Sequence, residues 1–422
     1  MAGKATAVRM LLRLALAVVL GAVGPMLLSP PPGALIGGGL AYAAVTCSQP
    51  PEPGPVATGL PWHLQRYALE RLTGIASGDG VLVGVIDSGV DVRHPQLADA
   101  VVAGADALDP AGNDGRADCE GHGTSVASLI AGRPAAGVQF RGIAPRAQIL
   151  PVRVSERRQI DGQARGRSVT LAGLGAAIRT AVDRRVRVLN LSLAAYGADD
   201  PELRAAIEYA VSRDVVVVAA AGNLHDQTGQ GRSDPVPYPA AYPGVLGVGA
   251  IGPDGLRLGT SEVGDWVDLT APGGEIVAAG PVRGHVLGNG TSFAAPQVAA
   301  AAALVRQYYP RLNAAQVAAR LIATADPAPG GAAEYGAGVV NPYRAVTSRL
   351  EGAPEQLAAL PAPDPTVDQN VASRWNPALV VAGLGAVVAV VIALAGAALP
   401  RGTRRRWRPG LRPDPPSGSP DS

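Results

Sequence analysis

Ser292 and His122 stand in two short stretches that could support nucleophilic catalysis. Ser292 opens an apolar helix in "GNGTSFAAPQVAAAAALV" (288–305), and the unpaired N–H groups at a helix start favour a developing oxyanion. His122 lies in "DCEGHGTSVASLIAG", where Gly121 and Gly123 let the backbone approach other groups closely. Taken separately, the serine could be an ordinary N-cap and the histidine a structural residue. Taken together, they could supply a nucleophile and its general base.

Two further polar residues end strand-like runs. Asp87 follows "VLVGVI", and Asn223 closes "VVVVAAAGN". In an open α/β sheet, functional groups gather at the carboxyl ends of the strands. Asp87 alone is typical of a turn after a strand. Together with Ser292 and His122, however, these two residues complete a set of nucleophile, base, orienting acid and amide donor. The occurrence of all four in one chain favours a catalytic role over a separate structural role for each residue.

These residues require a framework of alternating strands and helices. Short apolar runs rich in β-branched residues predict strands at 81–87, 147–154, 186–193, 214–223 and 245–251. Because nearly continuous apolar runs are typical of strands buried on both faces, they indicate a parallel sheet covered by helices. The helices are predicted at 123–132, 169–184, 201–213 and 292–309. The fold class is therefore α/β, an open, doubly wound, mostly parallel sheet with helices on both faces.

Four sequence blocks resemble the signature blocks of subtilisin-like serine proteases of the peptidase S8 family. They are "GVIDSGVDVRHPQL", "GHGTSVASLIAG", "AAAGN" and "NGTSFAAPQVA", in the family's order Asp, His, Asn, Ser, and the similarity covers residues 62–350. The resemblance implies that Ser292 attacks a peptide carbonyl, that His122 accepts and later returns the proton, and that Asp87 orients the imidazole. It also implies an oxyanion hole formed by Asn223 and the backbone N–H of Ser292.

A fifth stretch, "NLSLAAYG" (190–197), resembles the family's substrate-pairing strand. The resemblance implies that Ser192, Leu193 and Ala194 hydrogen-bond an extended peptide by strand addition. The family commonly has a glycine where Ala194 stands, so the extra methyl group is expected to narrow the pocket for the residue before the scissile bond. A second departure is Gln297, where many members have histidine, and this position is expected to lie off the catalytic face.

Both ends of the chain carry segments typical of membrane targeting. Residues 1–43 combine a basic start, an apolar run and a small-residue exit, which predicts a secretory signal peptide. Residues 378–399 are apolar and uncharged over the roughly 20 residues needed to span a bilayer, and arginines follow at once. Since positive residues stay cytoplasmic, this transmembrane helix would leave the catalytic domain outside the cell membrane and the basic, disordered tail (400–422) inside. The intervening segments are a Pro-rich arm (44–61), the protease domain (62–350) and a linker (351–377).

Composition and cysteine content limit the partners and cofactors. The net charge is +2 and the basic residues are scattered outside the C-terminal end, so no nucleic-acid partner is expected. The only two cysteines, Cys47 and Cys119, are expected to form a disulfide in an oxidising compartment. The alternative is a metal site from Asp118, Cys119, Glu120 and His122, but it lacks a second Cys or His at ligand spacing. No metal or other cofactor is predicted. Calcium binding is left open, because some subtilisin-like enzymes hold calcium, but no compact acidic loop in this sequence demands it.

Within the subtilisin-like enzymes, the chain most resembles the mycosins, membrane-anchored proteases of type VII secretion systems. The resemblance rests on the signal peptide, the short Pro-rich arm, "PWHLQRY", "DCEGHGT" and the C-terminal membrane helix with its basic end. It implies an endopeptidase that cuts proteins leaving through the secretion apparatus, with that membrane complex as a partner. It equally allows a structural subunit that stabilises the complex, with proteolysis secondary. The arm is shorter than the roughly 40 residues that independent folding usually needs, which disfavours an inhibitory pro-domain.

Overall fold

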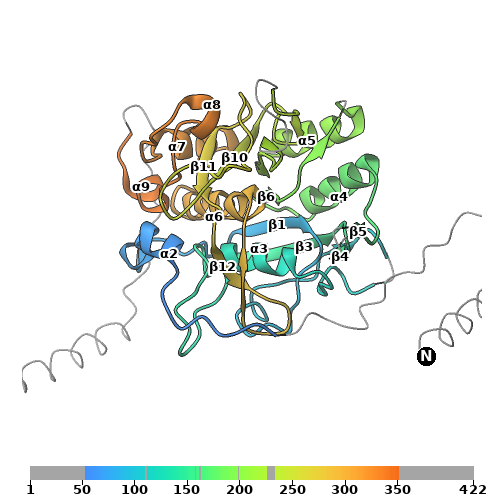
Figure 1. Cartoon of the computed structure of the whole chain (residues 1–422), viewed down its shortest axis with the longest axis horizontal. Coiled ribbons are helices and arrows are strands. Elements are labelled where there is room, and N and C mark those ends of the chain that lie inside the picture. Colours follow the sequence, from blue (N-terminus) through green and yellow to red (C-terminus); the bar gives the residue numbers. More distant parts are fainter. Residues whose placement is uncertain are drawn as a thin grey trace, which may run out of the picture. The chain divides into compact units, whose positions relative to one another are not determined.

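The structure is a computed structural model that describes residues 53–109, 112–156, 158–160, 163–197, 199–225 and 233–350 (Figure 1). Within these ranges no helix is both long enough and apolar enough to cross a membrane. The predicted signal peptide, linker, transmembrane helix and basic tail lie outside the described residues, as does most of the predicted arm.

A seven-stranded sheet forms the centre of the domain, in the order β11-β10-β8-β6-β1-β3-β2. All of its strand pairs are parallel. The strands are β1 (Leu82–Asp87), β2 (Ala105–Asp106), β3 (Gln148–Arg153), β6 (Val188–Leu191), β8 (Val216–Ala220), β10 (Val245–Ile251) and β11 (Leu269–Pro272). The five predicted strands are thus confirmed, and the edge strands β2 and β11 were missed. β2 has only two residues and β11 ends in a proline, so neither produces a long apolar run.

Alternation along the strands explains why both faces of the sheet are covered. Val83 and Val85 of β1 belong to one buried hydrophobic cluster, whereas Ile86 belongs to a second. Successive side chains of a strand point to opposite faces, so the two clusters are the cores of the two faces. The first cluster includes side chains of α3 (His122–Ala131) and α6 (Thr291–Tyr308), and the second those of α4 (Leu171–Asp183) and α5 (Pro201–Ser212). These four helices confirm the predicted ones to within two residues at each end.

α6 is the long helix against which much of the sheet packs (Figure 1). It contacts β6, β8, β10 and β11, and the alanines at 299–303 are fully buried. Such small side chains let a helix approach a sheet closely along its whole length, and dense packing of this kind holds both ends of the helix in place. The N-terminal end of α6 is thereby fixed at the edge of the sheet where β1, β6 and β8 end.

Shorter elements surround this framework. Three two-stranded ribbons pair β12 (Ile276–Ala279) with β13 (His285–Gly288), β4 (Arg158–Ile160) with β5 (Gln163–Arg165), and β7 (Ala195–Tyr196) with β9 (Pro237–Tyr238). The other helices within the described residues are α2 (Trp62–Tyr67), η1 (Leu69–Leu72), α7 (Ala314–Ala323), α8 (Ala332–Tyr335) and α9 (Pro342–Thr347). The described end of the Pro-rich arm lies against β13, where His285 donates a backbone hydrogen bond to the Pro55 carbonyl (2.8 Å).

Candidate active site

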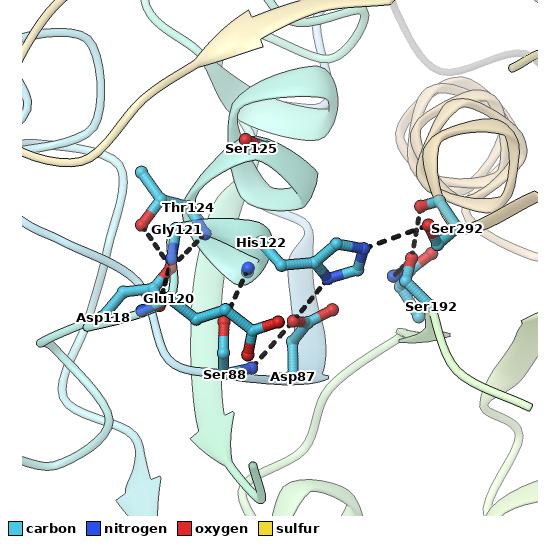
Figure 2. A network of polar contacts seen from close by, with 12 residues as sticks. Asp87, Ser88, Asp118, Glu120, Gly121, His122, Thr124, Ser125, Ser192 and Ser292 are labelled. Carbon is cyan, nitrogen blue, oxygen red and sulfur yellow. Dashed lines mark hydrogen bonds and ion pairs between the residues drawn. The ribbon is translucent and has the colours of Figure 1, made fainter. Parts of the chain in front are cut away.

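Asp87, His122 and Ser292 meet at the carboxyl edge of the sheet. Asp87 is the last residue of β1, His122 the first of α3 and Ser292 the second of α6. His122 Nδ1 lies 2.8 Å from Asp87 Oδ1, and His122 Nε2 lies 3.0 Å from Ser292 Oγ (Figure 2). Three residues up to 205 positions apart are therefore joined by one chain of hydrogen bonds, in the geometry that moves a proton from a serine hydroxyl to an imidazole.

Asp118 fixes the point at which α3 begins, and with it the position of His122. Its Oδ1 accepts a hydrogen bond from the Gly121 N–H (2.8 Å), and its Oδ2 accepts from the N–H (2.9 Å) and hydroxyl (2.7 Å) of Thr124 (Figure 2). The N-cap residue Gly121 has no side chain and a φ of 97°, so the carboxylate three residues earlier satisfies the first N–H groups of the helix instead. The sequence had pointed to Asp118 only as a metal ligand, a role that this geometry does not support.

Glycine is required at position 123 because the helix passes very close to β1. A Cβ atom there would stand 3.1 Å from the Asp87 Cβ and would overlap the Gly89 carbonyl oxygen. The N–H of Gly123 donates to Ser88 Oγ (2.9 Å), and the Ser88 N–H donates to Asp87 Oδ1 (2.7 Å). These contacts hold the Asp87 carboxylate in the orientation in which it meets the imidazole.

The charges around His122 favour its protonated form. Burial by itself would lower the pKa of the ring, but the charge and hydrogen bond of Asp87 and the charges of Glu120 and Asp118 outweigh burial and raise the pKa to about 9. The ring also packs edge-on against Phe293, with centroids 5.6 Å apart. An imidazolium formed when the serine loses its proton is thus stabilised in place.

Asn223 is held through its side-chain oxygen, which leaves its amino group available. Asn223 Oδ1 accepts hydrogen bonds from the N–H (2.9 Å) and the hydroxyl (3.2 Å) of Thr291, the first residue of α6. Among the described residues, no hydrogen bond from Asn223 Nδ2 to protein is found. Sequence reasoning missed Thr291, whose position directly before Ser292 was the available signal. The amide is therefore presented as a donor beside the start of α6.

Ser192 lies at the site, and its hydroxyl forms hydrogen bonds within the protein. Its hydroxyl donates to the Ser292 carbonyl oxygen (2.8 Å; Figure 2). It also accepts from Asn190 Nδ2 (2.9 Å), so it anchors the first turn of α6 to the end of β6. Leu193 and Ala194 follow as half-buried residues leading into β7. Hydrogen bonds from this segment to a substrate would thus come from its backbone.

The other histidines do not join the site. His63 and His285 are buried and pack against Phe140, and the buried His94 packs against His285. His225 pairs with Asp234, with His225 Nδ1 2.7 Å from the Asp234 carboxylate.

Gln297, a departure from the family pattern, is fully buried and donates to the carbonyl oxygens of Pro272 (2.6 Å) and Phe293 (2.9 Å). Within the described ranges, no cluster of three or more His, Cys, Asp or Glu side chains could hold a metal ion. Cys119 is buried, and its predicted partner Cys47 lies outside the described residues, so the disulfide stays a prediction.

Comparison with known proteins shows what the chain is similar to. Residues 78–339 match the model of the subtilase family, peptidase S8. The chain is 36% identical to Mycosin-1 of Mycobacterium tuberculosis (strain ATCC 25618 / H37Rv) over 405 residues, covering 85% of this chain and 90% of the relative. It is 33% identical to Mycosin-3 of the same organism, covering 86% and 94%. The crystal structure of MycP1 from Mycobacterium smegmatis superimposes with a TM-score of 0.60 at 31% identity, covering 74% of this chain and 94% of that one.

Proposed function

This chain belongs to the subtilase family and is related to the mycosins within it, and we propose that Asp87, His122 and Ser292 are the catalytic residues of this serine endopeptidase. The observation that carries the proposal is the pair of contacts at His122, 2.8 Å to the carboxylate and 3.0 Å to the serine oxygen. Acylation of a serine by a peptide substrate requires a nucleophile, a base and an orienting acid at hydrogen-bonding distance from one another.

In the proposed mechanism, Ser292 Oγ attacks the carbonyl carbon of the scissile peptide bond while His122 Nε2 accepts its proton. Asp87 holds Nδ1–H, so Nε2 is the nitrogen with the free lone pair, and the carboxylate stabilises the imidazolium. The imidazolium then donates the proton to the leaving amine, and the acyl-enzyme is hydrolysed by water with His122 again as base. Asn223 Nδ2 and the Ser292 N–H donate to the oxyanion of each tetrahedral intermediate.

Substrate binding is proposed at the segment Ser192, Leu193 and Ala194. An extended peptide would pair with the backbone of this segment, which places the residue before the scissile bond between Ala194 and the loop of Asn223. The Ala194 methyl group narrows that space relative to glycine. We therefore infer a preference for small side chains at this substrate position.

We further propose that the enzyme processes proteins exported by a type VII secretion system and supports that secretion from the cell membrane. The support is the near full-length similarity to Mycosin-1 and to a MycP1 whose structure is described as from the ESX-1 type VII secretion system. Anchoring rests on the predicted signal peptide and on the apolar segment 378–399. A tether of this kind raises the effective concentration of substrates that emerge near the membrane.

A second candidate is a structural role in the secretion complex. It is favoured by the description of a related MycP1 as an essential component of the type VII (ESX-1) secretion system. Ser292→Ala separates the two roles, because it removes the nucleophile and leaves the fold intact. Secretion that continues while substrate processing stops would establish an independent structural role; secretion that stops with an assembled complex would show that cleavage is required.

The substrate is tested directly by incubating the purified protein with candidate exported proteins and sequencing the new termini. We expect discrete cleavage sites that share a small residue before the cut. The Ser292→Ala protein is the control, and cleavage that persists in it would refute the assignment of the nucleophile.

A further inference from the structure

Glu262 is a fully buried carboxylic acid placed behind the loop that carries Asn223. Its Oε1 accepts a hydrogen bond from the Leu224 N–H (3.1 Å) and another from the Tyr196 hydroxyl (2.7 Å). Burial raises the pKa of the carboxyl group, and its Oε2 finds no hydrogen-bond partner among the described residues. An acid in this setting costs stability relative to an apolar side chain of similar size, so its presence calls for a functional reason.

Tyr196 extends the contact to Asn223 itself. Its hydroxyl donates to Glu262 and accepts a hydrogen bond from the Asn223 N–H (3.3 Å). The backbone of the preceding residue, Gly222, packs directly against the Glu262 carboxylate. A Cβ atom at position 222 would stand only 2.4–2.5 Å from that carboxylate. The Glu262 N–H also donates to the Gly222 carbonyl oxygen (3.3 Å). The backbone of three consecutive residues, 222–224, is thus held by one tyrosine and one acid.

The two contacts on Asn223 are complementary. Thr291 holds the side-chain oxygen from the side of α6, and Tyr196 with Glu262 holds the backbone from the opposite end of the residue. An oxyanion donor is effective only when its position is fixed before charge develops. Tyr196 lies in β7, two residues after the proposed substrate-binding segment 192–194, so its hydroxyl links the strand that follows this segment to the loop of Asn223.

We propose that Tyr196 and Glu262 are positioning residues for the oxyanion hole, which hold Asn223 where it meets the tetrahedral intermediate. The proposal rests on the catalytic roles assigned above. Neither side chain touches the reacting atoms, so both act through Asn223. Their effect should therefore appear in the chemical step and not in the binding of substrate.

The first test compares Tyr196→Phe with wild type in the full-length protein, using a short peptide substrate. The variant loses only the hydroxyl, and we expect kcat to fall about 10-fold with KM within about twofold, a smaller loss than the roughly 10²- to 10³-fold expected without the Asn223 donor. Affinity for a peptide boronic acid, which forms a tetrahedral adduct with serine, should fall in parallel with kcat. An altered KM with unchanged kcat would overturn the proposal, because Tyr196 would then be a wall of the substrate pocket.

Tyr209→Phe is the matched control. Its hydroxyl also donates to a carboxylate, Asp183 Oδ1 at 2.6 Å, but on the surface formed by α4 and α5. We expect its kcat and KM to equal those of wild type. Glu262→Gln keeps an oxygen acceptor of the same shape and should retain most activity, whereas Glu262→Leu should lose as much kcat as Tyr196→Phe. Equal activity of Gln and Leu at this position, each with a wild-type melting temperature, would overturn the role of Glu262.

A double-mutant cycle tests whether the two groups act through Asn223. In an Asn223→Ala background, Tyr196→Phe should cause no further loss of kcat, because the donor that it positions is already absent. A full additional 10-fold loss there would overturn the proposal. An active wild-type protein with an unaffected Tyr196→Phe variant refutes the positioning role alone. Activity retained by Ser292→Ala refutes the catalytic assignment, and the positioning role with it.

Discussion

Acid should destabilise the protease domain through His63, a histidine with no place in the catalytic chemistry. His63 is fully buried, and neither ring nitrogen has a hydrogen-bond partner among the described residues. Its ring packs beside those of Trp62 and Phe140, at centroid distances of 6.3 and 6.4 Å. Burial lowers the pKa of this histidine from 6.5 to about 3, so the native protein keeps the ring neutral.

The sign and size of the effect follow from this difference in pKa. Below pH 6.5 the unfolded chain binds a proton at His63 that the native protein does not bind, so the free energy of unfolding falls as pH falls from 6.5 toward 3. At about 1.4 kcal/mol per pH unit, His63 alone should remove about 2 kcal/mol between neutral pH and pH 5. Above pH 6.5 it should have no effect.

The measurement is urea unfolding at pH 8 and pH 5, with Ser292→Ala in every protein to prevent self-cleavage. His63→Phe removes the titrating group and keeps an aromatic ring. The difference in free energy of unfolding between this variant and the Ser292→Ala parent should therefore shift by about 2 kcal/mol in favour of the variant from pH 8 to pH 5. Contributions of other groups, including His122, cancel in this comparison. Phe140→Leu is the control, since it alters the packing around His63 without removing a titratable group. It should lower the free energy of unfolding by the same amount at both pH values. A His63→Phe difference that is identical at pH 8 and pH 5 would refute the reasoning.

Three further predictions concern the site and the disulfide. Asn223→Ala should lower kcat by about 10²- to 10³-fold in a peptide assay, and an unchanged rate would show that another donor fills the oxyanion hole. Catalysis needs a neutral His122, and Asp87 raises the pKa of the ring, so kcat/KM should rise with pH along a limb above pH 6.5. Asp87→Asn should move that limb to lower pH, and a limb that stays in place would contradict the electrostatic role of Asp87. Mass spectrometry of non-reduced peptides should find Cys47 joined to Cys119, and two free thiols would reject the bridge.

The framework could be predicted from sequence, and the proposed catalytic residues could be selected, because their signals are local. Long β-branched runs such as 245–251 and an apolar helix such as 292–309 differ from their surroundings over many residues, and the structure contains both. The edge strand at 269–272 is too short and ends in proline, so its place in the sheet depends on pairing with β10, which the sequence does not encode locally.

The contacts that support the site could not be predicted from the sequence, because they form only once the chain has folded. Asp118 is recognised as the group that caps α3 only once the helix start and the turn before it are seen together. The hydrogen bond between Tyr196 and Glu262 joins residues 66 positions apart, and each is unremarkable within its own segment. Contacts of this kind are created by the fold, so local patterns point to the proposed nucleophile, base and acid but not to the groups that hold them.

The most direct test of the central claim is covalent labelling of the nucleophile by a fluorophosphonate, which reacts with a serine activated by a neighbouring base. Treatment of the purified protein followed by peptide mapping should place a single adduct on Ser292, formed at a rate that falls steeply in His122→Ala. A protein that cleaves peptides yet carries no adduct on Ser292, or one that is labelled equally fast without His122, would contradict the account.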